Sequence, residues 1–122
     1  MQINMETDAG ANLIRSYDAG RIGVNEEFFN SNIIVASDVL ISDWKITAPE
    51  ELCLDDFRKM AALEPTIVLL GTGEQQIFPA QDLLTPLMHQ QIGLETMTTR
   101  NACHTYNVLV HEGRRVVAAL FV

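Results

Sequence analysis

The residue types best suited to chemistry are concentrated in one polar segment, Thr98–Asn107, which reads Thr-Thr-Arg-Asn-Ala-Cys-His-Thr-Tyr-Asn. The segment follows a short predicted strand and begins a predicted helix, so its first backbone N–H groups are exposed and favour an anion. Cys103, in the first helical turns, is a candidate nucleophile if its position lowers the thiol pKa. The alternative is a small apolar side chain buried in the core, the commoner role of a lone cysteine. His104 is the nearest candidate base, but adjacent helical residues diverge by about 100°, which disfavours direct contact.

A second candidate segment, Gly71-Thr72-Gly73, ends an apolar predicted strand, Thr66–Leu70, and precedes a predicted helix. Ligands of open α/β sheets bind at such carboxyl ends of strands, where glycine lets a ligand approach the backbone. No Gly-Lys-Ser/Thr follows, and the dinucleotide pattern Gly-x-Gly-x-x-Gly fails at Gln76, so neither a P-loop nor a dinucleotide fingerprint is present. The alternative is that the glycines only make a turn.

These two segments follow strands that are expected to be parallel neighbours, so their tips should converge. The convergence predicts an anion site formed by backbone N–H groups and by the hydroxyls of Thr72, Thr98 and Thr105. Tyr106 is expected in the core with its hydroxyl hydrogen-bonded, and Asn107 is expected to tie the helix to a loop. The candidate ligand-binding residues are Gly71, Thr72, Gly73, Met97, Thr98, Thr99, Asn101, Cys103, His104, Thr105, Tyr106 and Asn107.

Composition and charge exclude several functional classes. The 122 residues include 8 Lys or Arg against 16 Asp or Glu, a net charge of −8, which argues against nucleic acid or an anionic membrane surface as a partner. No metal or cofactor is expected, because His104 and His111 share a helical face without carboxylate ligands at suitable spacing. The chain has no His-Glu-x-x-His, no serine elbow and no paired carboxylates. Two cysteines outside any Cys-x-x-Cys, no membrane-spanning apolar run and no signal-peptide pattern predict a cytoplasmic protein.

The order of elements predicts an α/β fold. Strands come first, and helices and strands then alternate, which implies parallel crossovers. Residues 1–11 are expected to be a flexible N-terminus and residues 12–122 a single domain. The predicted strands are Asn12–Tyr17, Arg21–Asn25, Ile33–Ala36, Val39–Trp44, Thr66–Leu70, Leu94–Met97 and Val116–Val122. The predicted helices are Asp55–Leu63, one beginning near Pro79 that Pro86 bends or breaks, and one from Thr98 or Thr99 to about His111.

Several short strings occur together in one order along the chain: Leu69–Gly73, Pro79, Gly93–Thr99, Ala102–Leu109 and Glu112–Leu120. In this combination the chain resembles the small Mth-type domain family over Ile14–Val122. Relatives in that family include a mitochondrial respiratory complex I assembly factor and the adipogenesis-associated domain protein, and many members are of unknown function. The resemblance implies a three-layer single domain, with a mixed central sheet flanked by helices and an additional N-terminal antiparallel β portion.

The chain departs from the family pattern at one position. His104 stands where the resemblance implies arginine in the Cys-Arg-Thr-Tyr-Asn segment. If that arginine binds an anion in relatives, the activity is in doubt here, since histidine carries only a fraction of a charge at neutral pH.

Two hypotheses for function follow. The first is a non-enzymatic interaction or assembly module that binds a protein partner, as a monomer or small homo-oligomer, through an apolar surface near Phe28, Phe29 and Trp44. The second is a small-molecule (anion) binding protein or enzyme, with its site between Gly71–Gly73 and Thr98–Asn107.

Overall fold

The strands that are apolar at every position form the middle of the protein. The computed structural model describes residues 10–122, so the expected flexible terminus lies outside the described residues except for Gly10 and Ala11. Strands β4 (Ile33–Ala36), β6 (Ile67–Gly71) and β8 (Val116–Leu120) are buried along almost their whole length. Because successive side chains of a strand point to opposite faces, this burial requires cover on both sides of the sheet.

These strands belong to a mixed five-stranded sheet with the order β5-β4-β8-β6-β7. Strand β6 runs parallel to β8 and to β7 (Gly93–Met97). Strand β4 is antiparallel to β8 and to β5 (Val39–Ile41). The parallel pairing of β6 with β7 confirms the predicted crossovers and brings the two candidate segments to the same edge of the sheet.

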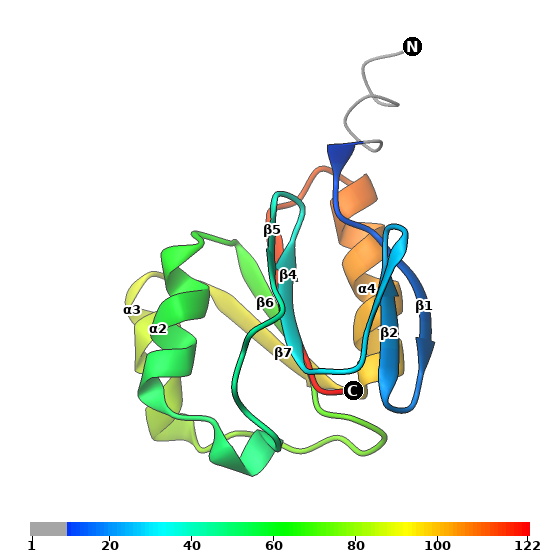
Figure 1. Cartoon of the computed structure of the whole chain (residues 1–122). Helices are drawn as coiled ribbons and strands as arrows, with labels where there is room; N and C mark the ends of the chain where they lie inside the picture. The colour runs from blue at the N-terminus through cyan, green and yellow to red at the C-terminus, as the bar shows by residue number, and fades with distance from the viewer. Residues whose placement is uncertain (1–9) are drawn as a thin grey trace.

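Helices α2 (Leu54–Ala62) and α3 (Thr85–His89) cover one face of this sheet (Figure 1). Two 3-10 turns, η1 (Pro49–Glu51) and η2 (Gln81–Leu84), precede them. The single helix predicted from Pro79 is therefore a 3-10 turn followed by a short helix, with Pro86 in the first turn of α3, where proline costs no hydrogen bond. Met88, expected in its apolar stripe, is 65% exposed.

Helix α4 (Thr99–His111) covers the opposite face, together with a small antiparallel sheet (Figure 1). That sheet contains β1 (Ile14–Asp18), β2 (Arg21–Val24) and β3 (Glu27–Phe29) in this order. The third strand, β3, is absent from the strands predicted from sequence. The three layers and the N-terminal antiparallel portion confirm the predicted fold class.

The apolar surface predicted near Phe28, Phe29 and Trp44 is not continuous in the structure. Trp44 is only 7% exposed, packs against Phe121 with ring centroids 5.1 Å apart, and donates its Nε1–H to a carboxylate oxygen of Asp56. Phe29 is half-buried against the core beneath the small sheet. Phe28 alone is well exposed, at 59%, and the Arg21 guanidinium lies 3.8 Å from its ring centroid.

Candidate functional site

The tips of β6 and β7 converge on the start of α4, as the strand order predicts. The Thr72 amide donates to the Met97 carbonyl at 3.0 Å, and the Thr99 amide donates to the Gly73 carbonyl at 2.9 Å. The Gly73 amide in turn donates to Thr99 Oγ1 at 2.7 Å. The loop and the helix are therefore joined by direct hydrogen bonds.

The hydroxyls and amides expected to bind an anion are largely committed to these internal bonds. Thr99 is fully buried and its hydroxyl donates to the Phe121 carbonyl at 2.6 Å. The Thr72 hydroxyl donates to the Gln75 carbonyl and accepts from the Ile77 amide. Thr98 caps the helix by accepting from the Asn101 amide at 3.3 Å. Thr72 and Thr99 therefore have a structural role at this junction, and their part in binding a ligand stays a prediction.

Gly71 permits the close approach of α4 to the sheet. A Cβ at this position would lie 2.9 Å from the Thr99 Cα and 3.0 Å from both the Ala102 Cβ and the Leu120 Cδ2. Gly73, two residues later, has a φ of +94°, a conformation that favours glycine. Both glycines thus have a conformational or packing role at this junction.

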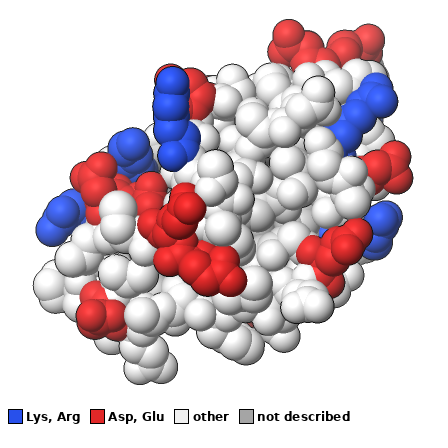
Figure 2. All heavy atoms as spheres, turned by 60° about the horizontal axis from the view of Figure 1, so that its bottom comes forward, with Lys and Arg blue, Asp and Glu red and all other residues white. Residues whose placement is uncertain are grey.

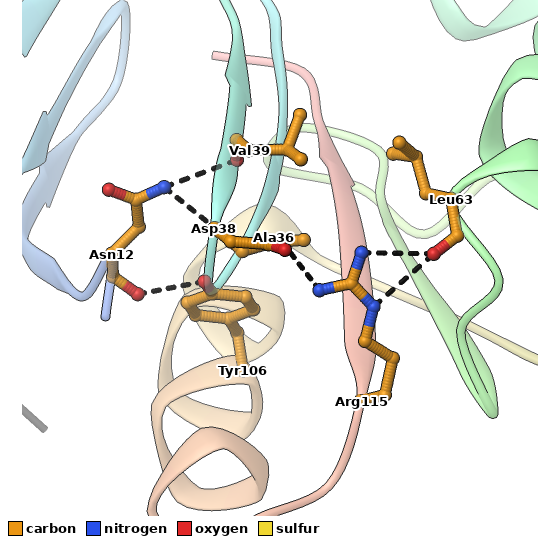
Figure 3. Close-up of polar contacts among 7 residues, drawn as sticks. All are labelled: Asn12, Ala36, Asp38, Val39, Leu63, Tyr106 and Arg115. Atoms are coloured by element: carbon orange, nitrogen blue, oxygen red, sulfur yellow. Dashed lines mark hydrogen bonds and ion pairs between the residues drawn. The ribbon is translucent and has the colours of Figure 1, made fainter. Parts of the chain in front are cut away.

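Tyr106, shown in Figure 3, and Asn107 hold the N-terminal part of the chain onto α4. The buried Tyr106 hydroxyl donates to the Asn12 carbonyl at 2.8 Å, and the Asn12 side chain donates to the Ala36 and Val39 carbonyls. The Asn107 side chain accepts from the Ile14 amide at 2.9 Å and donates to the Ile14 carbonyl at 2.7 Å. The expectations for Tyr106 in the core and Asn107 as a tie are confirmed, although Asn107 ties the helix to a strand.

Arg115 makes a second polar junction that the sequence analysis missed (Figure 3). Its Nε and Nη2 donate to the Leu63 carbonyl at 3.2 and 2.9 Å, and its Nη1 pairs with the Asp38 carboxylate. Hydrogen bonding to the Arg115 guanidinium holds the pKa of the Asp38 carboxyl below its usual range. Arg115 therefore joins the end of α2 to the turn between β4 and β5. It connects residues far apart in sequence, so no local pattern predicts it.

Cys103 is buried on the inner side of α4. Burial raises the pKa of the Cys103 thiol to about 12, opposite to the lowering expected near a helix N-terminus, and the charge on Arg100 only partly offsets this effect. The thiol is therefore protonated at neutral pH, which opposes a role as nucleophile. Cys53, by contrast, is exposed.

Alkylation rates test this difference between the two thiols. At neutral pH, iodoacetamide is expected to label Cys53 at least about tenfold faster than Cys103, because Cys103 is both protonated and shielded. Peptide mass spectrometry after timed quenching measures the two rates, with urea-unfolded protein as the reference in which both react alike. Faster labelling of Cys103 in the folded protein would restore it as a nucleophile.

Two shallow hollows remain beside the first turns of α4. One, of about 300 Å³, is lined by Tyr17, Gly73, Glu74, Thr98 and Arg100. The other, of about 210 Å³, is lined by Ile14, Arg15, Ser16, Tyr17, Arg100, Cys103, His104 and Asn107. Tyr17, Glu74 and Arg100 were not among the predicted site residues. Arg100 lies inside the polar segment that the sequence singled out, whereas only the tertiary fold brings Tyr17 there.

The other candidate residues are spread around this junction. Met97 and Thr105 are half-buried, while Asn101 and His104 are exposed. Across residues 10–122, no three His, Cys, Asp or Glu side chains gather closely enough to hold a metal ion.

Residues 14–121 match the model of a family described as a protein of unknown function, DUF498/DUF598. The chain belongs to this family. It is 31% identical over 103 residues to the 13 kDa major membrane protein of Francisella tularensis, with 84% of each chain covered. It is 34% identical over 82 residues to human NADH dehydrogenase (ubiquinone) 1 alpha subcomplex assembly factor 3. That match covers 66% of this chain and 45% of the human protein, so the matched region accounts for under half of the longer relative.

Solved structures similar to this DUF498 chain share its fold. A crystal structure of a Bordetella parapertussis protein superposes with a TM-score of 0.86 at 34% identity, covering 92% of this chain and 96% of that one. A Bordetella pertussis protein described as an Mth938-like domain has a TM-score of 0.80 at 29% identity, covering 90% and 85%. The predicted resemblance to the Mth-type family is confirmed. Within residues 10–122, no helix has the length and apolar character needed to cross a membrane.

Proposed function

We propose that this DUF498 protein is a non-enzymatic interaction module that assists the assembly of a multisubunit protein complex. The observation that carries the proposal is the internal commitment of the polar groups at the strand tips. The Thr72 and Thr99 hydroxyls bond to backbone groups, and the Cys103 thiol is buried and protonated. The two hydroxyls, which could bind a substrate in an enzyme of this architecture, instead hold the loop and the helix in place. The thiol, which could act as a nucleophile, is buried.

The names of relatives support the same proposal. Several animal relatives are named NADH dehydrogenase (ubiquinone) 1 alpha subcomplex assembly factor 3. A corresponding role here is assistance in assembling a respiratory NADH dehydrogenase. Because the matched region is under half of the human protein, the proposal assigns to this chain the domain's part of that role.

The charge distribution favours a protein as the partner. On the face shown in Figure 2, basic side chains are dispersed around the rim among acidic ones, and a broad uncharged area lies between them. On this face of a chain with a net charge of −8, the basic groups do not form the continuous positive stripe that a polyanion requires. Mixed charges around an uncharged area are typical of protein interfaces.

We further propose that the protein acts in the cytoplasm as a monomer or small homo-oligomer. Both Cys53 and Cys103 are free thiols, as is typical of proteins from a reducing compartment. Cell fractionation and light scattering of the purified protein test these two points.

Deletion of the gene, followed by complementation, tests the assembly role. In the source organism, loss of the protein is expected to lower the amount of assembled respiratory NADH dehydrogenase and to accumulate subassemblies, as resolved on native gels with mass spectrometry. Wild-type protein and a Cys103→Ala variant are both expected to restore the complex, since the proposal requires no chemistry from the thiol. A normal complex in the deletion strain would contradict the assembly role. Failure of a folded Cys103→Ala protein would contradict its non-enzymatic character.

A further inference from the structure

Basic side chains of this acidic protein gather along the seam between β1 and α4. Arg100 and His104 lie one helical turn apart on α4, and together with Arg15 of β1 they line the 210 Å³ hollow. Tyr17 and Arg100 also line the neighbouring hollow of 300 Å³. The seam thus carries two arginines on a chain whose net charge is −8, with the acidic groups Glu74 at its rim and Asp18 near Tyr17.

Tyr17 contributes a buried polar atom without a partner. Its hydroxyl oxygen is shielded from solvent and has no hydrogen bond to any of the residues 10–122. Burial raises the pKa of the Tyr17 hydroxyl, with the nearby Cys103 and Glu74 adding to the effect, so the group stays protonated and able to donate. Native proteins rarely leave such a group unsatisfied, and the Tyr17 side chain lines both hollows, so a ligand bound there is a candidate partner.

Arg100 supplies the complementary charge. Its Cζ lies 5.2 Å from the centre of the Tyr17 ring, a cation–π contact that holds the guanidinium over the ring. Within the described part of the chain, no carboxylate forms an ion pair with Arg100. Arg100 therefore brings a guanidinium without an ion-pair partner among the described residues to the two hollows that Tyr17 also lines.

We propose that the seam between β1 and α4 binds a small oxyanion, with the Arg100 guanidinium and the Tyr17 hydroxyl as its donors. Arginine matches carboxylate and phosphate oxygens through paired N–H groups. The volume of 300 Å³ is at the lower end for ligand sites and fits a small molecule. Glu74 at the rim repels a second negative charge, which favours a monocarboxylate over a phosphate dianion. The site differs from the one predicted from sequence, because side chains and not the Gly73 and Asn101 amides hold the ligand.

The test is a titration of ¹⁵N-labelled protein followed by NMR, with acetate and inorganic phosphate as separate probes at constant ionic strength. Acetate is expected to cause saturable shifts confined to the Arg100 side-chain N–H and to amides near Tyr17 and Gly73. Arg100→Gln is expected to weaken acetate binding at least about tenfold, since it removes the charge. Tyr17→Phe is expected to weaken it about fivefold, the value of one hydrogen bond.

Two controls separate binding from folding and from general charge. Arg58→Gln makes the same charge change on an exposed residue of α2, across the main sheet, and is expected to bind acetate as wild type does. Tyr17→Phe removes only an unpartnered hydroxyl, so its thermal stability is expected to equal or exceed that of the wild type. Wild-type acetate affinity in Arg100→Gln or Tyr17→Phe, or equal shifts with chloride, would overturn the proposal. Tighter binding of phosphate than of acetate would support the oxyanion site but overturn its preference for a singly charged ligand.

Discussion

Replacing Tyr106 with alanine is expected to lower the free energy of unfolding by about 3–5 kcal/mol, the usual cost of deleting a buried aromatic side chain. Tyr106 is fully buried, in the cluster that joins α4 to the small sheet and to the inner face of the main sheet. The substitution leaves a cavity between these layers and removes the hydrogen bond to the Asn12 carbonyl. Urea unfolding followed by circular dichroism measures the loss.

Tyr106→Phe separates the two contributions. It keeps the ring and removes the hydroxyl, so the Asn12 carbonyl loses a partner at an expected cost of about 1 kcal/mol. If the phenylalanine variant lost as much stability as the alanine variant, the hydroxyl and not ring packing would dominate. If neither variant lost stability, Tyr106 would not be needed for folding, and a role in binding a ligand would be favoured instead.

Much of the fold could be predicted from local patterns. The Thr66–Leu70 segment, apolar after its first residue, and the apolar Val116–Val122 segment predicted buried strands, and β6 and β8 have this burial. Thr98 as the cap of α4 and Pro86 as an interruption were also predictable, since each acts within a few residues of its own position. The third strand, β3, was missed because its pairing with β2 depends on a hairpin and its sequence lacks a strong alternation.

The candidate site was harder to predict, because residue type does not show which partner a polar group takes. Thr72 and Thr99 are suitable for an anion site on composition and position, yet a local turn contact with Gln75 and a long-range contact with Phe121 occupy their hydroxyls. Tyr17 comes from the first strand and reaches α4 only through the packing of the small sheet. Trp44 was placed in the predicted apolar surface, but its long-range contact with Phe121 buries it.

The converging strand tips and the polar side chains of α4 therefore have different roles: the first fix the helix, and the second line the seam. Hydrogen bonds between the loop at Gly73 and the start of α4 fix the position of the helix. This fixed helix then presents Arg100 and His104 along the seam with β1. The arginine expected at position 104 is absent, but a guanidinium lines the same hollow from one turn earlier. A loss of the loop–helix junction should thus disturb both the fold and the seam.

Gly71→Ala is expected to break that junction and to lower the free energy of unfolding by about 2–3 kcal/mol, at the upper end for overpacking. The added methyl group would meet the Thr99 Cα at 2.9 Å, and backbone cannot move aside as a flexible side chain can. The Ala102 and Leu120 side chains, both at 3.0 Å, close the other directions. The helix must therefore shift away from β6, which weakens the bonds of Thr99 to Gly73 and Phe121.

Gly93→Ala is the matched control for this substitution. Gly93 also lies in a strand of the main sheet, but a Cβ there would meet nothing closer than 3.8 Å. Its unfolding free energy is expected to stay within about 0.5 kcal/mol of the wild type or to rise slightly, because alanine restricts the unfolded chain. Urea unfolding of both variants, with amide exchange at Thr99 as the local readout, measures the contrast. Equal stability of the two variants would show that α4 can move off β6 at little cost, and the close packing at Gly71 would then not be what fixes the helix.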